Sequence, residues 1–471
     1  MTSCPNGPDS VGGNGGDRHD TVVQPGGHDG AGAAVRAKPR NPLPILLLAA
    51  AVIELAVFIP SALLLDFDDY VWAASSGDTP RYVKEAKQLL ATGSYPLERI
   101  RTPGYPLFLA GAFLLGGDRY GYYVAIVAQL AMNVGFLWLL WRLLELVAPQ
   151  SRLAVKLVMA SAGFIAGLGQ AMFLLSDLLA GLCFAFFGYV MLAKRSPWWV
   201  LGGGLALATA TLTRPTFTWF VVLIPPMAWL LGRFATKVPW SHVAVYVLAS
   251  LTAVGVNSAL ERRSRNLVGP DSFFTYHASV ILYNIPEPRA REWEEHLRLY
   301  HQEISRRAGK PFESLTRAEK DPIAKAILLD TLRSHPLQCA RVWAVGFAKY
   351  CIIPIESLVN YFCRLATWQE FYYHRSFLRL PMVLLWLPLW MLVYVPPWGN
   401  RRRYWPFYAV AAMLFFYIVS LCAPIPATGD RMRIPVLPFM LAWAAVNLEA
   451  VLGVMSRGKD AACQAAEATP S

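Results

Sequence analysis

The chain has 471 residues, of which 55% are hydrophobic and only 16% are charged. Soluble proteins average about 25% charged residues, so this composition excludes an ordinary soluble enzyme and a protein that is disordered throughout. The seven cysteines form no Cys-x-x-Cys pair, which argues against a disulfide scaffold or a zinc site. The formal net charge is +12, and the basic residues lie mainly between apolar segments, where they predict membrane orientation rather than nucleic-acid binding.

Ten apolar segments predict an all-α polytopic membrane protein. A helix needs about 20 residues to cross a bilayer, and ten segments approach or exceed that length. They are residues 42–65, 119–141, 153–173, 176–193, 198–213, 216–232, 239–260, 376–395, 404–422 and 433–454. Residues 1–41, which precede them, are rich in Gly, Asp and Ser and predict a disordered tail.

The positions of the basic residues predict which ends of these segments face the cytoplasm. Arg36, Lys38 and Arg40 precede the first segment, and every second connection after it is also basic. Cytoplasmic connections carry such an excess of Lys and Arg, so we expect a multi-pass membrane protein with both termini in the cytoplasm. The chain then divides into a tail, a membrane module with a first outer loop, a long outer loop, C-terminal membrane helices and a second tail. These parts are residues 1–41, 42–260 with 66–118, 261–375, 376–455 and 456–471.

The residue patterns of both predicted outer loops indicate helices outside the bilayer core. From Pro80 to Leu90 the apolar residues form one stripe, which is typical of a helix lying on a membrane surface. Residues 105–117 are apolar but too short to cross, so we expect them to be embedded at the same surface. The loop 261–375 begins with charges of both signs, which predict soluble helices, and its residues 341–362 predict an interfacial or re-entrant helix.

The first outer loop carries two candidate functional residues. Asp78 comes directly before the amphipathic helix, whose N-terminus favours an ionised carboxylate. We expect Thr79 to cap this helix. Arg101 lies just before the embedded helix, where a guanidinium would bind a phosphate through two parallel hydrogen bonds. The alternative for Arg101 is an interfacial anchor, and for Asp78 a solvated residue at the end of a span.

Three later outer turns also carry charged residues. Asp177 lies between the third and fourth apolar segments, and Arg214 lies between the fifth and sixth. Arg431 and Arg433 precede the last segment on the predicted outer side, against the usual excess of basic residues inside, and this favours a ligand. A solvated turn or helix cap is the alternative for Asp177, and a side chain reaching to the interface is the alternative for Arg214.

In this order the motifs resemble those of the membrane glycosyltransferases of the GT-C fold, in particular the bacterial relatives of protein O-mannosyltransferases and lipid A aminoarabinose transferases. The matching stretches are Asp78-Thr-Pro-Arg-Tyr82-Val-Lys-Glu-Ala86, Arg101-Thr-Pro-Gly-Tyr105-Pro106-Leu-Phe-Leu, Ser176-Asp177, Thr213-Arg214-Pro215 and Arg431-Met-Arg433-Ile-Pro435. The resemblance implies a bundle of about ten transmembrane helices, with surface helices in the first outer loop and a long outer loop.

Such enzymes move a sugar from a polyprenyl-phosphate carrier to an acceptor on the outer face and invert the anomeric centre in one displacement. The resemblance therefore implies a hexosyl or pentosyl transferase of cell-envelope glycosylation, integral to the bacterial inner membrane. Its partners would be a polyprenyl-phosphate sugar donor, a glycan, lipid or protein acceptor, and membrane lipids, but no nucleic acid. Asp78 and Asp177 would be catalytic, and they would hold a divalent cation if the enzyme uses one. The implied substrate-binding residues are Tyr82, Arg101, Tyr105, Arg214, Arg431 and Arg433.

The first motif departs from the family pattern. Many relatives have two adjacent acidic residues there, whereas Asp78 is followed by Thr79, and the acidic pair Asp68-Asp69 lies upstream. Asp68 or Asp69 therefore remains an alternative to Asp78 as the key acid.

Two other functions remain open. The first is a non-catalytic transporter or flippase of lipid-linked sugars, which would carry polar residues along a path through the midplane and often has two related halves. The second is a scaffold whose long outer loop binds a partner. The concentration of polar residues on the predicted outer face favours the transferase over the transporter.

Overall fold

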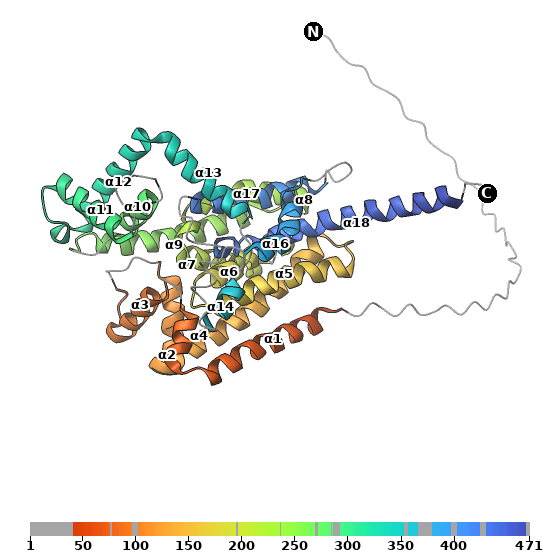
Figure 1. Ribbon diagram of the computed structural model, residues 1–471, viewed down its shortest axis with the longest axis horizontal. Helices are drawn as coiled ribbons and strands as arrows, with labels where there is room; N and C mark the ends of the chain where they lie inside the picture. The colour runs from red at the N-terminus through yellow and green to blue at the C-terminus, as the bar shows by residue number, and fades with distance from the viewer. Residues whose placement is uncertain are drawn as a thin grey trace, which may run out of the picture. The chain divides into compact units, whose positions relative to one another are not determined.

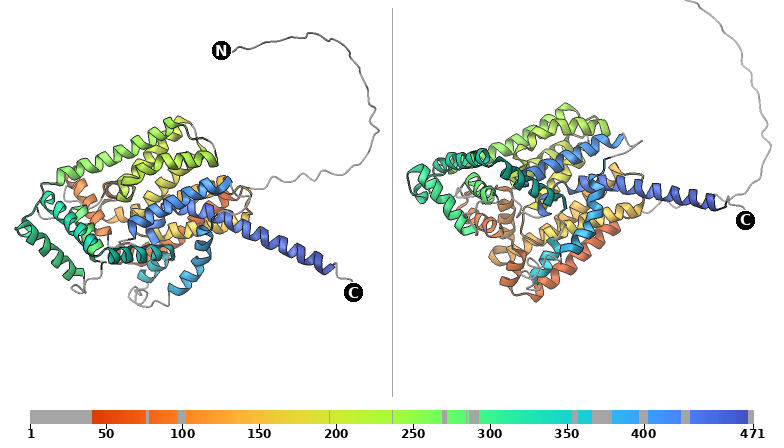
Figure 2. Two further views of the ribbon diagram at one scale, coloured as in Figure 1. Left: turned by 90° about the horizontal axis from the view of Figure 1, so that it is seen from above. Right: turned by 45° about the horizontal axis from the view of Figure 1, so that its top comes forward.

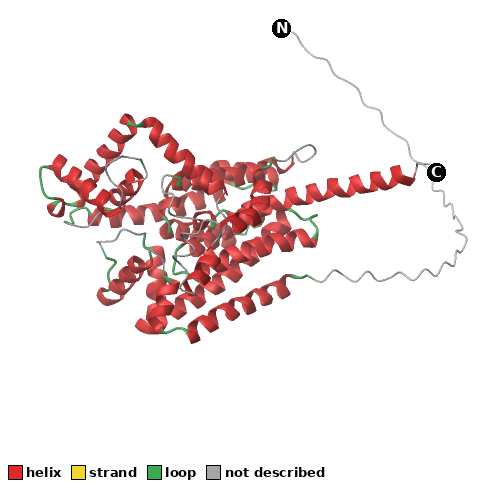
Figure 3. Cartoon of the chain, in the orientation of Figure 1, coloured by secondary structure: helices red, strands yellow, loops and turns green. Residues whose placement is uncertain are grey.

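The computed structural model describes residues 41–75, 78–96, 102–194, 196–235, 237–268, 272–283, 285, 293–352, 357–365, 379–396, 403–423 and 430–467. Within these residues every regular element is a helix (Figure 3). The chain divides into two units, Met1–Pro42 and Leu43–Ser471, and all of the described helices belong to the second. The predicted disordered tail therefore lies almost entirely outside the described residues.

The helices agree with the predicted polytopic membrane architecture. Six described helical segments are long and apolar enough to cross a membrane, and each coincides with a predicted span. They are α1 (Leu43–Leu64), α4 (Gly104–Val147), α5 (Leu153–Ala171), η1 with α8 (Pro215–Leu223 and Ile224–Phe234), α9 (Trp240–Ser264) and α17 (Trp405–Cys422). The other four predicted spans contain shorter helices: α6 (Asp177–Ala193), α7 (Pro197–Thr213), α16 (Arg379–Tyr394) and the first part of α18 (Leu437–Glu467).

A glycine separates the surface part of α4 from its crossing part. Gly117 has a φ of 64°, in the left-handed region that residues with a side chain rarely adopt. This break lies at the boundary that the sequence predicts between the embedded helix 105–117 and the span 119–141. One continuous apolar run can therefore turn from the membrane surface into the bilayer.

Helix α4 is central to the bundle. It packs against α1, α3 (Thr79–Thr92), α5, α6 and α18, while α7 packs between α6 and α9 (Figures 1 and 2). Small residues allow close approach, as Gly188 of α6 does where it meets the ring of Phe439. Such contacts are typical of helix association in membranes, where packing replaces the hydrophobic driving force.

The two predicted outer loops contain helices. The first contains α2 (Phe67–Ala74) and α3, and the second contains α10 (Phe273–Tyr283), α11 (Trp293–Ala308), α12 (Arg317–Ser334), α13 (Pro336–Ile352) and α14 (Ser357–Leu365). Helices α10, α11 and α12 share a hydrophobic core of their own, which includes Tyr300, Ile304 and Ile327. We call these three helices the loop subdomain. The helix predicted over 341–362 overlaps α13 and α14, and residues 353–356 of it lie outside the described residues.

Gly104 provides a test of the close approach between α4 and α7. A Cβ atom at Gly104 would lie 2.8 Å from the backbone of Leu212 and 2.6 Å from Thr213 Oγ1, so Gly104→Ala forces the backbone to shift. We expect a loss of about 1–3 kcal/mol in unfolding free energy, measured in detergent micelles. Gly111→Ala in the same helix is the control, because its Cβ meets nothing within 4 Å. Equal stability of the two variants would contradict the close approach.

Candidate active site

Asp78 lies at the start of α3, but its carboxylate does not cap the helix. Its backbone carbonyl accepts hydrogen bonds from the N–H groups of Arg81 and Tyr82, while its side chain accepts one from Arg431 Nη2 at 2.9 Å. The predicted cap at Thr79 is wrong, since Asp78 occupies the N-cap position. The Thr79 hydroxyl instead donates to the carbonyl of Leu174 at 3.0 Å. This bond fixes the start of α3 against the turn that precedes α6.

Arg431 reaches Asp78 from the opposite end of the sequence. It lies in the short 3-10 helix η6 (Asp430–Arg433), just before α18. The two side chains retain 20% and 19% of their exposure, respectively, so the pair is largely shielded but still accessible to a ligand. Burial alone would lower the pKa of Arg431, but the nearby Asp78 and Tyr82 outweigh it and raise that pKa. Arg431 therefore stays a fixed positive charge.

Asp177 and Arg214 form a second, deeper pair. Asp177 is the first residue of α6, and Arg214 lies in the turn between α7 and η1. Their side chains form an ion pair and keep only 1% and 10% of their exposure. Arg214 also donates to Met432 Sδ at 3.0 Å. Burial, and then the like charge of Arg431, lower the pKa of Arg214, which indicates that the two pairs are neighbours.

We call Asp78, Asp177, Arg214 and Arg431 the acid–arginine cluster. Its four members come from the starts of α3 and α6, the end of α7 and the approach to α18. They carry two formal negative and two formal positive charges. Since arginine has five N–H donors, each guanidinium can hold its carboxylate and still donate to an anion.

Two predicted tyrosines lie beside this cluster. The Tyr82 hydroxyl is 3.2 Å from Ser176 Oγ, and its ring packs edge to face on Tyr105 with centroids 4.9 Å apart. The Tyr105 hydroxyl donates to Gln129 Oε1 at 2.5 Å, and Gln129 Nε2 donates to the carbonyl of Phe173 at 2.7 Å. This network ties α3, α4 and the turn before α6 into one wall.

One of the two remaining predicted residues is not described by the structure, and the other lies beside α16. Arg101 lies outside the described residues, although its neighbour Thr102 donates to the carbonyl of Thr213 at 2.9 Å, directly beside Arg214. Arg433 is buried at 1% exposure, and its guanidinium carbon lies 4.3 Å from the ring centroid of Trp390 in α16. Arg433 therefore packs toward α16.

The alternative acids Asp68 and Asp69 are both exposed in the first turn of α2. Acidic side chains at that position stabilise the N-terminus of a helix. Asp78, by contrast, is held against the guanidinium of Arg431.

Sequence reasoning missed two basic residues that hold the site's framework. Arg364 of α14 donates to the carbonyl of Ser75, and its guanidinium carbon lies 5.7 Å from the Trp72 ring centroid. Arg81 of α3 lies 4.7 Å from the centroid of Tyr276 in α10. Neither had a sequence signal, because each partner lies in a different loop. Together they connect both outer loops around Asp78.

Among the described residues, the His, Cys, Asp and Glu side chains do not form a metal-binding cluster. In the described part of the chain, no three His, Cys, Asp or Glu residues lie close enough to hold an ion. Asp78 and Asp177 each face a guanidinium rather than each other. This donor set suits an anionic ligand better than a divalent cation, which needs about six or more oxygen ligands.

Comparison with known proteins gives remote structural neighbours. No family model and no curated protein matches the chain. Among solved structures, it is similar to ArnT from Cupriavidus metallidurans bound to undecaprenyl phosphate, at 15% identity, with 91% of this chain and 81% of that chain covered and a TM-score of 0.33. It is also similar to ArnT in the apo state, at 14% identity, with 84% and 78% covered and a TM-score of 0.29. These TM-scores are too low to assign a function, which is inferred below from the acid–arginine cluster.

Proposed function

We propose that this chain is a membrane glycosyltransferase that moves a sugar from a polyprenyl-phosphate carrier to an acceptor on the extracytoplasmic face. The observation that carries the proposal is the acid–arginine cluster, in which two shielded carboxylate–guanidinium pairs are neighbours. Arg214 contacts Met432, the residue after Arg431, and its pKa is lowered by burial and then by the charge of Arg431. Such a site supplies both a base for a hydroxyl and fixed positive charge for a departing phosphate.

The two arginines suit the leaving group. When the bond between the sugar and its carrier breaks, the lipid phosphate takes up negative charge. Arg431 is partly exposed and Arg214 lies deeper beside it, so a phosphate oxygen can approach Arg431 first. Each charge-assisted hydrogen bond contributes about 1.5–3 kcal/mol. Bonds that strengthen as the charge develops therefore lower the barrier.

The two carboxylates take different roles because their burial differs. Asp78 retains 19% of its exposure, so it can face an acceptor hydroxyl, whereas Asp177 retains 1%. Asp78 is the proposed base: the acceptor oxygen attacks the anomeric carbon, its proton passes to Asp78, and the carbon–oxygen bond to the phosphate breaks. A single displacement of this kind inverts the anomeric centre. Asp177 is a positioning residue that holds Arg214.

A chelator tests the divalent cation that the sequence leaves open. Because both carboxylates already face guanidiniums, we expect the leaving phosphate to be stabilised by arginine. Millimolar EDTA should then change the transfer rate by less than about twofold. A large loss that Mg²⁺ or Mn²⁺ restores would instead assign a cation to Asp78 or Asp177.

The direct experiment follows the sugar. Purified protein in lipid nanodiscs is given polyprenyl-phosphate donors labelled in the sugar, together with a panel of glycan, lipid and protein acceptors. Release of unlabelled polyprenyl phosphate with label in an acceptor of inverted configuration supports the proposal. Movement of intact labelled donor across proteoliposomes, without cleavage of the sugar, would show a transporter instead.

A further inference from the structure

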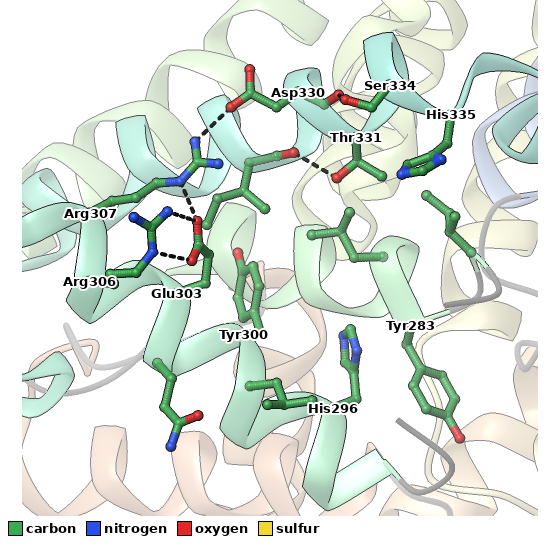
Figure 4. A pocket seen from close by; sticks show the side chains of 15 residues that line it. Tyr283, His296, Tyr300, Glu303, Arg306, Arg307, Asp330, Thr331, Ser334 and His335 are labelled. Carbon is green, nitrogen blue, oxygen red and sulfur yellow. Dashed lines mark hydrogen bonds and ion pairs between the residues drawn. The ribbon is translucent and has the colours of Figure 1, made fainter. Parts of the chain in front are cut away.

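The loop subdomain contains a groove that the proposed reaction does not use. It has a volume of about 660 Å³ and lies between α10, α11 and α12 (Figure 4). Ligand pockets in proteins commonly have volumes of about 300–1,000 Å³, so this groove can hold a small oligosaccharide. The hydrophobic core beneath it, which includes Tyr300, Ile304 and Ile327, gives it a firm base.

One wall of the groove is aromatic. The rings of Tyr283 and His296 lie 5.2 Å apart between centroids, and the rings of His296 and Tyr300 are stacked 6.4 Å apart. All three side chains line the cavity (Figure 4). The Tyr300 hydroxyl donates to the carbonyl of Thr275 at 3.2 Å, which anchors α11 to α10. Aromatic faces of this kind offer a large apolar surface with polar edges, which suits the mixed apolar and hydroxyl faces of a sugar ring.

The other end of the groove carries balanced charge. Glu303 accepts hydrogen bonds from Arg306 and Arg307 at 2.7 Å, and Arg307 also donates to Asp330 at 2.7 Å (Figure 4). Two acidic and two basic residues give this end a formal charge of zero. The guanidiniums hold the pKa of Glu303 down to about 2, opposed by partial burial, so the carboxylate is ionised at neutral pH. Paired donors and acceptors suit hydroxyl groups, whereas a zero net charge does not favour an anionic ligand.

The groove is connected to the acid–arginine cluster through α10. Arg81, whose N–H bonds to the carbonyl of Asp78, lies over the ring of Tyr276 at one end of α10. Tyr283, at the other end of α10, lines the groove. Tyr283 is seven positions further along the helix than Tyr276, which is two helical turns, or about 10 Å. Figures 1 and 2 show α10 and α3 at the same end of the molecule.

We propose that this groove binds a neutral oligosaccharide of a few sugar rings and holds it as the acceptor chain for the cluster. The binding claim stands on the groove alone, whereas the acceptor role rests on the proposed function. The aromatic wall packs on sugar faces, the charged end bonds hydroxyls, and α10 leads from the groove toward Asp78.

The test measures binding to the full chain in nanodiscs by isothermal titration calorimetry. The probes are mannotriose, maltotriose and arabinotriose as neutral sugars, and trigalacturonic acid as an anionic one. We expect saturable binding of at least one neutral trisaccharide, weakened tenfold or more by Tyr283→Ala and by Gln302→Ala, two exposed positions that line the groove. Arg298→Ala, on an exposed position of α11 outside the groove's lining, is the matched control and should bind as wild type.

Binding and transfer fail separately in this design. Asp78→Asn should bind the trisaccharide as wild type does, because Asp78 lies outside the groove. If no neutral trisaccharide binds, or if Tyr283→Ala and Gln302→Ala bind as wild type, the proposal is overturned even where sugar transfer is observed. Tighter binding of trigalacturonic acid than of every neutral sugar overturns the neutral class. Binding that depends on Tyr283 in a protein that transfers no sugar supports the groove and counts against the transferase.

Discussion

Asp78→Asn is expected to lower the rate of sugar transfer by at least 100-fold while donor binding changes little. Asn keeps the size of the side chain and can still accept the hydrogen bond that Arg431 donates at 2.9 Å. It cannot take a proton from an acceptor hydroxyl. General base catalysis commonly contributes 10²–10⁴-fold, so the loss should appear in kcat. The measurement is single-turnover transfer from a labelled polyprenyl-phosphate donor.

Asp69→Asn is the matched control for this variant. Asp69 is an exposed acid in the first turn of α2 and belongs to the pair that the sequence leaves as an alternative. We expect it to transfer sugar within about twofold of wild type. If Asp69→Asn loses activity and Asp78→Asn retains it, the key acid is misassigned. Melting temperatures of both variants show whether any loss reflects folding rather than chemistry.

The sequence alone could predict that the residues of the site lie on the same side of the membrane. Hydropathy sets the spans and the basic connections set their orientation, so Asp78 and Arg431 could be placed on one face although they are 353 residues apart. Which acid meets which arginine could not be predicted, because that depends on how α3, α6, α7 and α18 pack. The pairs of Asp78 with Arg431 and Asp177 with Arg214 appear only in three dimensions.

The different positions of Arg431 and Arg433 have a simple cause. Both lie in η6, a 3-10 helix, which has three residues per turn. Residues two apart in such a helix point in directions that differ by about 240°, or 120° the other way. Arg431 therefore faces Asp78 while Arg433 packs on Trp390. The sequence alone gives the two arginines equal weight, since the local helix type was not predicted.

In the long predicted outer loop, the helices could be predicted from the sequence but their packing could not. The loop's charge pattern predicted soluble helices, and the structure contains the helices α10, α11 and α12 there. The groove between them could not be predicted, because its aromatic wall and charged end come from three helices whose mutual packing is set by a small core. The contact of Arg81 with Tyr276, which joins this loop to the first, has no sequence signal either.

The second large effect concerns stability. Asp177→Ala should lower the free energy of unfolding by about 3–5 kcal/mol, because it leaves the Arg214 guanidinium buried without its carboxylate. Unfolding in mixed micelles, followed by tryptophan fluorescence, measures the loss. Asp118→Ala is the matched control: its pair with Lys87 is exposed, with 86% of the Asp118 side chain and 40% of the Lys87 side chain accessible. Exposed pairs of that kind contribute about 1 kcal/mol or less.

The double variant separates the structural role of the deep pair from its catalytic role. Replacing Asp177 with Leu and Arg214 with Met together removes both buried charges, and such replacements are often neutral or stabilising. We therefore expect stability to return to within about 1 kcal/mol of wild type while sugar transfer stays impaired, because the leaving phosphate has lost one of its two guanidiniums. Recovery of both stability and activity would show that Asp177 and Arg214 serve folding alone, and that Arg431 stabilises the phosphate without them.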